Sequence, residues 1–381
     1  MSTEIVLTNG RIVTADAAFE GSVVVRDGRI AEVSHGRSCA AGAIDLEGDT
    51  LVPGLIELHT DNMEKHFSPR PGVKWPAVPA VMAHDTQIAA GGITTVFDSL
   101  SLGDVRGDTD RVQNRTRMVE AICEASERRM TRAEHRLHLR CEVTPDDAIE
   151  AVDRWIDLPL VGLMSINDHT PGQRQFLDPS KLKQYYMGKF AMTEEQFEVF
   201  HARSLELHQR NAVKHRHEIV SRAQARALPL ASHDDATTEH VLEAVRNGMT
   251  IAEFPTTWEA AGASRDAGLA VLVGAPNLVL GGSHSGNIAA IDLIRAGQAD
   301  ILSSDYVPAS LMEGVFKLPG SDAGIDLPHA VRLASLNPAR AVGLNDRGEI
   351  AADKRADLVR VRMLGDAPMV RAVWREGERV V

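Results

Sequence analysis

The sequence predicts an α/β protein: a (β/α)8 TIM barrel with a small β-sandwich domain that both ends of the chain build together. Its 381 residues exceed one ordinary domain and suit a barrel with a small partner domain. The middle of the chain alternates apolar, strand-like runs with helical stretches, and both ends are rich in short β-type runs. With 44% hydrophobic and 25% charged residues, the chain can form a large core, which argues against wholesale disorder.

The N-terminal end of the chain reads as short strands joined by tight turns. Asn9-Gly10 and Asp27-Gly28 each lie between β-branched runs, which is the strongest short-range signal for a β-hairpin. The C-terminal end resumes this pattern in ADLVRVRM and MVRAVWREGERVV. We therefore expect residues 1–51 and 347–381 to form one β-sandwich domain, and residues 52–346 to form the barrel.

Eight apolar runs in the middle of the chain are the candidate barrel strands. Such runs, alternating with helices, favour a parallel sheet that is covered on both faces, and eight units make a closed barrel the simplest arrangement. A short apolar run is also compatible with a buried helix. The runs are LIELHTD (55–61), GITTVFDSL (92–100), RLHLRCEVT (136–144), LVGLMSIND (160–168), LPLASHDD (228–235), MTIAEFP (249–255), LAVLVGAPN (269–277) and ADILSSDY (299–306).

The stretch 181–226 is long for a connection between the fourth and fifth runs. Thr193 and Gln196 form a capping-box signature, which predicts a helix that begins after Thr193 and ends near residue 224. The extra length predicts a lid or a substrate-facing insertion.

Polar residues that bind metals or titrate follow most of the eight runs. Alternate residues of a strand point the same way, so His59 and Asp61 are placed to chelate one ion. The carboxyl ends of barrel strands are where such folds place catalysis, and imidazole with carboxylate suits zinc, manganese or iron. The remaining strand-end residues are Glu142, Asp168-His169, His233-Asp234-Asp235, Glu253, Asn277 and Asp305.

Each of these residues, taken alone, is more often a helix cap or a loop residue than a ligand. Asp234 and Asp235 in particular are candidates to cap the next helix. We interpret His138 and His215 as residues of solvated helix faces, because both lie in charged stretches. The joint occurrence of the ligand types at several strand ends is harder to explain by packing, and it favours a metal site.

The charge and the cysteines narrow the class of protein. A net charge of −12 argues against a nucleic-acid partner. The three cysteines are scattered and suggest no disulfide framework or zinc motif, which favours a reducing cytoplasm. The sequence has no signal-peptide pattern and no apolar run near membrane-spanning length, so we expect a cytoplasmic protein without a membrane partner.

Two segments resemble the amidohydrolase superfamily: LVPGLIELHTD, and SLNPARAVGLNDRGEIAADKRADLV near the C-terminus. The resemblance implies the barrel, the terminal β-sandwich and a divalent metal. The sequence departs from the usual pattern because Asp61 stands where a second histidine is usual. It also lacks the lysine at the end of the fourth strand that bridges two metals in many members, and the resemblance implies that Glu142 bridges instead.

A narrower resemblance covers nearly the whole chain. HTDNMEKHFSPRP (59–71), AHDTQIAAGGITTVFDSLSLGD (83–104), NDHTPGQRQF (167–176), SHDD (232–235), GGSHSGN (281–287) and SSDYVPASL (303–311) resemble the alpha-D-ribose 1-methylphosphonate 5-triphosphate diphosphatases of phosphonate utilisation. The resemblance implies hydrolysis of the triphosphate to the 5-phosphate and diphosphate, with one or two Zn, Mn or Fe ions, in a homo-oligomer. It implies a metal and catalytic set of His59, Asp61, Glu142, His169, His233 and Asp305. Asp305 is the candidate to accept a proton from the attacking water, because it lies on the last predicted strand and faces the pocket.

An anionic sugar substrate needs fixed cations, and several follow the strand ends. The candidate substrate-binding residues are Lys65, His66, Arg70, Arg174 and His284, the last within a glycine-rich loop. They are equally compatible with ordinary exposed loop charges. A metal-dependent hydrolase of a C–N bond, in a cyclic amide or an aminated ring, remains the alternative activity, and a scaffold without metal remains a non-enzymatic one.

Overall fold

The computed structural model describes residues 4–70, 72–103, 109–174, 183, 187, 192–283 and 286–381. All eight predicted runs form strands of one parallel sheet, in which each strand pairs with its neighbour in the sequence, so the predicted barrel is confirmed. These strands are β6 (Leu55–Thr60), β7 (Ile93–Leu102), β8 (Glu134–Glu142), β9 (Val161–Asn167), β10 (Leu230–His233), β11 (Ile251–Glu253), β12 (Ala270–Gly274) and β13 (Ile301–Ser303).

The barrel closes at the carboxyl ends of its first and last strands. Thr60 forms an isolated parallel bridge with Asp305, and its Oγ1 donates a hydrogen bond of 2.7 Å to the carbonyl oxygen of Asp305. The backbone N–H of Asp61 donates to the same oxygen at 3.1 Å. Closure of the barrel therefore holds the backbones of Asp61 and Asp305 side by side.

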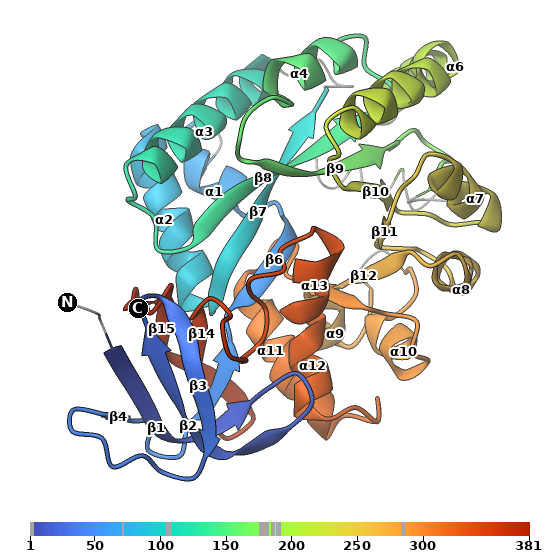
Figure 1. The fold of residues 1–381 in the computed structure, drawn as a ribbon. Coiled ribbons are helices and arrows are strands. Elements are labelled where there is room, and N and C mark those ends of the chain that lie inside the picture. The colour runs from blue at the N-terminus through green and yellow to red at the C-terminus, as the bar shows by residue number, and fades with distance from the viewer. Residues whose placement is uncertain are drawn as a thin grey trace.

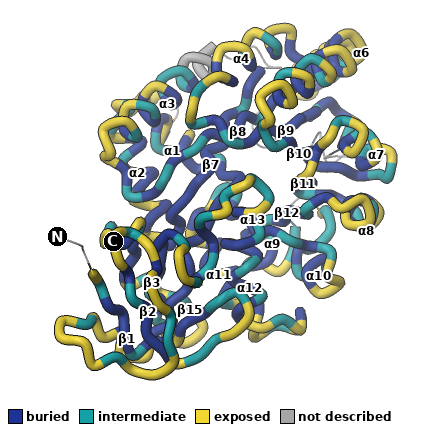
Figure 2. The backbone as a smooth tube through the Cα atoms, in the orientation of Figure 1, coloured by how far each residue is buried: buried dark blue, intermediate teal, exposed yellow. Residues whose placement is uncertain are grey.

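Helices cover the outside of the barrel (Figure 1), and they turn their exposed faces to solvent while the strands stay buried (Figure 2). They are α1 (Met63–Phe67), α2 (Ala77–Ala90), α3 (Thr109–Glu127), α4 (Ala148–Trp155), α6 (Glu194–Gln224), α7 (Thr238–Arg246), α8 (Trp258–Asp266), α9 (Ala275–Leu280), α10 (Ala290–Arg295), α11 (Ala309–Lys317), the 3-10 helix η1 (Leu318–Gly320), α12 (Leu327–Leu333) and α13 (Leu336–Ala341). No helix of the described residues is both long and apolar enough to cross a membrane.

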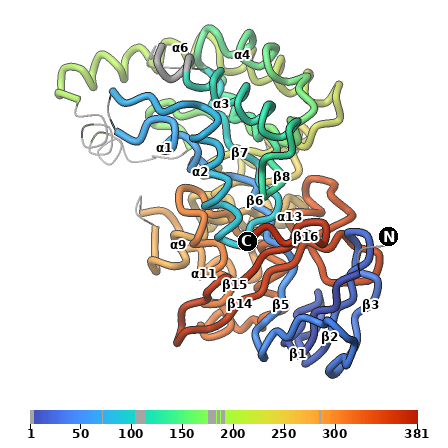
Figure 3. The backbone as a smooth tube through the Cα atoms, turned by 90° about the vertical axis from the view of Figure 1, so that its left-hand side faces the viewer, coloured from blue at the N-terminus to red at the C-terminus, as the bar shows by residue number. Residues whose placement is uncertain are grey.

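Both ends of the chain form a separate mixed sheet beside the barrel, as predicted (Figures 1 and 3). β5, from the N-terminal end, pairs with β14, from the C-terminal end, and so joins the two halves. The strands are β1 (Glu4–Val13), β2 (Ala18–Arg26), β3 (Arg29–His35), β4 (Ile44–Asp45), β5 (Thr50–Pro53), β14 (Leu358–Leu364), β15 (Ala367–Arg375) and β16 (Glu378–Arg379).

The two predicted hairpin turns have different outcomes. Asp27-Gly28 joins β2 to β3 with φ values of 48° and 80°, the left-handed pair that a two-residue hairpin of type I′ requires, and confirms the prediction. The hairpin at Asn9-Gly10 is wrong, because β1 continues through both residues. Asn9 has φ 57°, and the register of β1 against β2 shifts between Leu7 and Gly10, so the dipeptide makes a β-bulge.

The predicted capping box begins α6. Thr193 Oγ1 accepts the backbone N–H of Gln196 at 3.2 Å, and the Gln196 side chain accepts the N–H of Thr193 at 2.8 Å. The helix ends at Gln224, as expected. Most of the first part of the expected lid lies outside the described residues.

Apolar side chains fill the barrel below the carboxyl ends of its strands, among them Phe97, Ala231 and Ile251. Side chains two residues apart on a strand share a face. His233 therefore lies above Ala231, and Glu253 above Ile251. The same alternation that fills the barrel with apolar groups thus ends in a polar layer at the mouth.

Candidate metal centre

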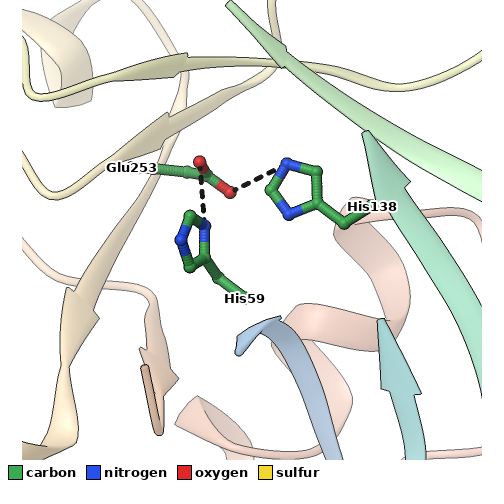
Figure 4. Close-up of side chains that lie close together, drawn as sticks. All are labelled: His59, His138 and Glu253. Carbon is green, nitrogen blue, oxygen red and sulfur yellow. Dashed lines mark ion pairs between the residues drawn. The ribbon is translucent and has the colours of Figure 1, made fainter. Parts of the chain in front are cut away.

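Three buried side chains from three barrel strands converge at the mouth: His59 at the end of β6, His138 in β8 and Glu253 at the end of β11. Both imidazole rings point toward the carboxylate (Figure 4). Glu253 Oε2 lies 3.2 Å from His59 Nδ1, and Glu253 Oε1 lies 3.7 Å from His138 Nε2. One ligand atom of each residue lies within 4.8 Å of the others, so the group has the dimensions of a metal site.

The interpretation of His138 and His215 as solvated helix residues is wrong. His215 lies buried in α6, with Nδ1 3.0 Å from the carbonyl oxygen of Val143. His138 is fully buried in a strand, and its Nδ1 lies 3.0 Å from the carbonyl oxygen of Leu58. Because a carbonyl oxygen can only accept, Nδ1 carries the proton. Nε2 then keeps its lone pair and lies 2.9 Å from Ser165 Oγ and 3.7 Å from Glu253 Oε1.

Burial decides the charge of these two rings. It lowers the pKa of His59 to about 3 and that of His138 to about 4, so both rings are neutral at neutral pH. A neutral imidazole is the form that binds a metal.

A second group of possible ligands lies beside the first and consists of His169, His233 and Asp234. His233 Nδ1 lies 3.1 Å from Glu253 Oε2, so the two groups share this carboxylate. His59 and His233 stack with ring centroids 5.3 Å apart. The two groups therefore form one continuous centre.

The alternative role of Asp234 and Asp235 as caps of the next helix is wrong, because Thr237 is the N-cap of α7. Asp234 instead lies buried with its Oδ2 3.5 Å from His233 Nε2 and 4.0 Å from His169 Nε2. Burial raises the pKa of Asp234 to about 7. A carboxyl group this costly to ionise without a cation is typical of a functional site.

Glu142, at the end of β8, holds the imidazole of His169. Its Oε1 lies 2.5 Å from His169 Nδ1, which leaves Nε2 of that ring directed to Asp234. Burial raises the pKa of Glu142, but the charge and hydrogen bond of His169 more than offset this, so the net pKa is lowered. Both residues were expected at the site, and the structure brings them together.

Among the described residues, three buried carboxylate oxygens at this centre make no hydrogen bond: Glu142 Oε2, Asp234 Oδ2 and Glu253 Oε1. A buried carboxylate oxygen without a donor is unfavourable unless a cation satisfies it. Together with neutral imidazoles, these oxygens are the donor set that Zn, Mn or Fe prefers. The residues present therefore fit a divalent ion.

Asp61 pairs with Arg140 of β8, whose Nη1 lies 2.7 and 2.9 Å from the two carboxylate oxygens. The Arg140 side chain is only 12% exposed, whereas that of Asp61 is 43% exposed. Arg140 was not among the predicted site residues, although it alternates with His138 and Glu142 along one strand and so shares their face. This alternation was the available signal for both Arg140 and His138.

Asp305 follows β13 with φ 51°. Burial raises the pKa of its carboxyl group to about 7, and the neighbouring charge of Asp61 adds to this effect. Glu57, on β6 below His59, is fully buried, and its pKa is also raised to about 7 by burial. Its carboxylate accepts the hydroxyl of Ser303 at 2.6 Å and so ties the first strand to the last.

The predicted substrate-binding residues lie in different settings. Lys65 and Arg70 are exposed on and after α1, and His66 is half-buried with Nε2 3.1 Å from Gln87 Oε1. Arg174 is buried and paired with Asp235 and Glu243, the latter at 2.7 Å. His284 lies outside the described residues.

Possible metal ligands at the mouth of a (β/α)8 barrel, with a mixed sheet from both termini beside it, are features of the metal-dependent barrel hydrolases. The chain belongs to the amidohydrolase family. The model of the Amidohydrolase family matches residues 198–380. The chain is 46% identical over 376 residues to alpha-D-ribose 1-methylphosphonate 5-triphosphate diphosphatase from Escherichia coli (strain K12), covering 98% of this chain and 100% of that protein.

Solved structures share the fold at low sequence identity. N-acetyl-D-glucosamine-6-phosphate deacetylase from Mycobacterium smegmatis superposes with a TM-score of 0.63 at 19% identity, over 99% of this chain and 100% of that chain. N-isopropylammelide isopropylaminohydrolase from Burkholderia multivorans ATCC 17616 gives a TM-score of 0.65 at 16% identity, over 99% and 98% of the two chains. These likenesses support the barrel and its terminal sheet.

Proposed function

We propose that this chain hydrolyses alpha-D-ribose 1-methylphosphonate 5-triphosphate to the 5-phosphate and diphosphate. The observation that carries the proposal is the 46% identity to the Escherichia coli diphosphatase over the full length of both proteins. The barrel alone does not decide the reaction, because one fold supports many chemistries.

The metal centre of this proposal uses the residues expected from the sequence, with three additions. His59, Asp61, Glu142, His169, His233 and Asp305 are the expected set, and His138, Asp234 and Glu253 join them by position. One or two Zn, Mn or Fe ions suit this set. An ion bound there supplies Lewis acidity, which polarises a phosphoryl oxygen and lowers the pKa of water.

Asp305 is the proposed general base. Burial raises the pKa of its carboxyl group to about 7 without a bound ion, and the ionised carboxylate is the group that accepts a proton from the attacking water. The backbone bridge to Thr60 fixes its place at the mouth. Arg140 adds a largely buried positive charge beside it, which suits the charge that develops on the phosphoryl oxygens.

The substrate cations of the proposal are Lys65, His66 and Arg70 from the segment after β6, with Arg174 and His284. Lys65 is held beside the residue that follows the proposed base, because its Nζ lies 2.5 Å from the carbonyl oxygen of Tyr306. Arg174 would contribute to phosphate binding only by sharing its guanidinium with Asp235 and Glu243.

The reaction can be tested directly by phosphorus NMR. We expect the purified protein with added Mn²⁺ or Zn²⁺ to release diphosphate from the ribose 5-triphosphate, and chelation to abolish the release. The His59→Ala variant serves as the matched control for contaminating phosphatases. Stepwise release of inorganic phosphate would contradict the proposed bond cleavage. Turnover of a cyclic amide without any phosphorus product would favour the C–N hydrolase instead.

Arg70→Ala should mainly weaken substrate binding. Arg70 is exposed and lies beyond the ligand cluster, so we expect KM for the triphosphate to rise about tenfold with kcat little changed. Steady-state kinetics measure both constants. Arg371→Ala, which removes an exposed charge from β15, is the control and should change neither. An unchanged KM in Arg70→Ala would remove Arg70 from the binding residues.

A further inference from the structure

A buried network of hydrogen-bonded side chains lies behind the barrel wall, between α2 and the strands β7 and β8. It consists of His84, Asp85, Asp98 and His135, all fully buried. Asp98 accepts from both rings: its Oδ1 lies 2.7 Å from His84 Nε2, and its Oδ2 lies 2.7 Å from His135 Nδ1. The centre described above uses none of these residues.

At the end of this network away from the barrel mouth, the charges of Asp85 and Asp98 are balanced by those of His135 and Arg132. His135 Nε2 lies 3.3 Å from Asp85 Oδ1, and Arg132 Nη1 lies 3.1 Å from Asp85 Oδ2. Because both nitrogens of His135 face carboxylates, the ring is an imidazolium. Two carboxylates are thus matched by two cations. His84, Asp98 and His135 have the spacing of possible metal ligands, but hydrogen bonds within the protein already satisfy every polar side-chain atom of these three residues and of Asp85.

At its other end, the network reaches the mouth of the barrel through the contact of His84 with Asn62. With Nε2 of His84 donating to Asp98, Nδ1 is the acceptor of that ring. Asn62 Nδ2 lies 3.0 Å from this nitrogen, 3.0 Å from Gln87 Oε1 and 3.3 Å from His66 Nε2, so the amide turns its NH2 group toward this side. The opposite atom, Oδ1, then faces outward and accepts from Lys65 Nζ at 3.4 Å.

We propose that His84 is a positioning residue: through the amide of Asn62 it holds Lys65 against the carbonyl oxygen of Tyr306, directly after Asp305. Lys65 Nζ donates to that oxygen at 2.5 Å, and its side chain is otherwise exposed. The protonation of His84 at Nε2 thereby determines the position of the Lys65 ammonium group at the surface. This inference rests on the proposed function, because it assigns that ammonium group to the phosphates of the substrate.

Two substitutions of His84 separate positioning from packing. His84→Asn keeps a polar atom near the position of Nδ1, facing Asn62. His84→Gln keeps a donor near the position of Nε2, facing Asp98, and removes the acceptor of Asn62. We expect KM for the triphosphate to rise about tenfold in His84→Gln, with kcat within about threefold, and to stay near wild type in His84→Asn. Parallel losses of kcat and thermal stability in both variants, with no difference in KM, would overturn the proposal.

A double-mutant cycle tests whether His84 acts through Lys65. In a Lys65→Met background, His84→Gln should have no further effect on KM, because the group that it positions is gone. Asn62→Ala leaves the bond between His84 and Asp98 in place and should reproduce the KM effect, so the test survives if His84→Gln does not fold. Additive effects of the two substitutions would contradict the proposal.

A readout without turnover separates this inference from the proposed function. The rate at which acetic anhydride labels Lys65, followed by mass spectrometry, should rise about threefold or more in His84→Gln and stay unchanged in His84→Asn. The amine must lose its proton to be acylated, and the hydrogen bonds that it donates to Tyr306 and Asn62 stabilise the protonated form. If the wild type releases no diphosphate but the labelling rates differ in this way, positioning stands and the substrate is wrong. If the labelling rates are equal, positioning fails whatever the substrate.

Discussion

Replacing Asp305 with asparagine should lower kcat about 10³-fold, within the range expected for loss of a general base. The carboxylate is the group poised to accept the proton, whereas the structural bonds of this residue come from its backbone carbonyl, which accepts from Thr60 and Asp61. Asparagine tolerates the left-handed backbone at φ 51° about as well as aspartate does. The fold and the thermal midpoint should therefore be little changed.

The pH profile adds a second readout for this variant. Since the base acts when ionised, wild-type kcat/KM should rise with pH through the pKa of Asp305, and the residual activity of Asp305→Asn should lack this limb. Asp353→Asn is a matched control, because Asp353 also has a positive φ of 66° but is exposed in a turn beside the terminal sheet. Wild-type kcat in Asp305→Asn would refute the assignment, and a loss of thermal stability would make the activity uninformative.

The sequence sufficed for the barrel because the strands are read from local features. Each run is mainly apolar, and most of the runs end in polar residues at a length that fits a buried strand, so pattern and turn chemistry agree. Asn9-Gly10 shows where such reasoning fails. The dipeptide provides a left-handed residue, which suits a hairpin and a bulge equally, and only the pairing of β1 with β2 decides between them.

The part of the site that stands at strand ends could be predicted from the sequence. His59, Glu142, His169 and His233 stand at strand ends, and their positions follow once the barrel is assumed. His138 lies four residues before the end of its strand, behind a charged segment, and its burial depends on the neighbouring strands rather than on its own flanks.

Glu253, the carboxylate between His59, His138 and His233, was recognised as a strand end but not as a shared partner. That role depends on contacts between β6, β8, β10 and β11, which are distant in the sequence. The sequence names the residues that reach the mouth of the barrel, whereas the register of the strands decides which of them meet.

Asp98→Asn should strongly destabilise the fold, because it removes one of the two buried carboxylates that balance His135 and Arg132 behind the barrel wall. Charge and hydrogen bonds from Asp98 and Asp85 outweigh the burial that lowers the pKa of His135, and raise it to about 9. Relative to an ordinary value near 6.5, this shift corresponds to roughly 3 kcal/mol of stability. We expect a loss of that order in the free energy of unfolding, measured by urea denaturation at pH 7.

The sign of the pH dependence distinguishes this mechanism from simple loss of packing. A group whose pKa is raised on folding contributes its stability fully below its unfolded pKa, and loses it as pH rises through the folded value. Wild-type stability should therefore fall between about pH 6.5 and 9, and Asp98→Asn should flatten this fall because its His135 has less to lose. Asp366→Asn, in the exposed turn between β14 and β15, should keep the wild-type slope. If Asp98→Asn lowers stability by the same amount at every pH, the charge of His135 does not stabilise the fold, and Asp98 contributes only through its neutral hydrogen bonds.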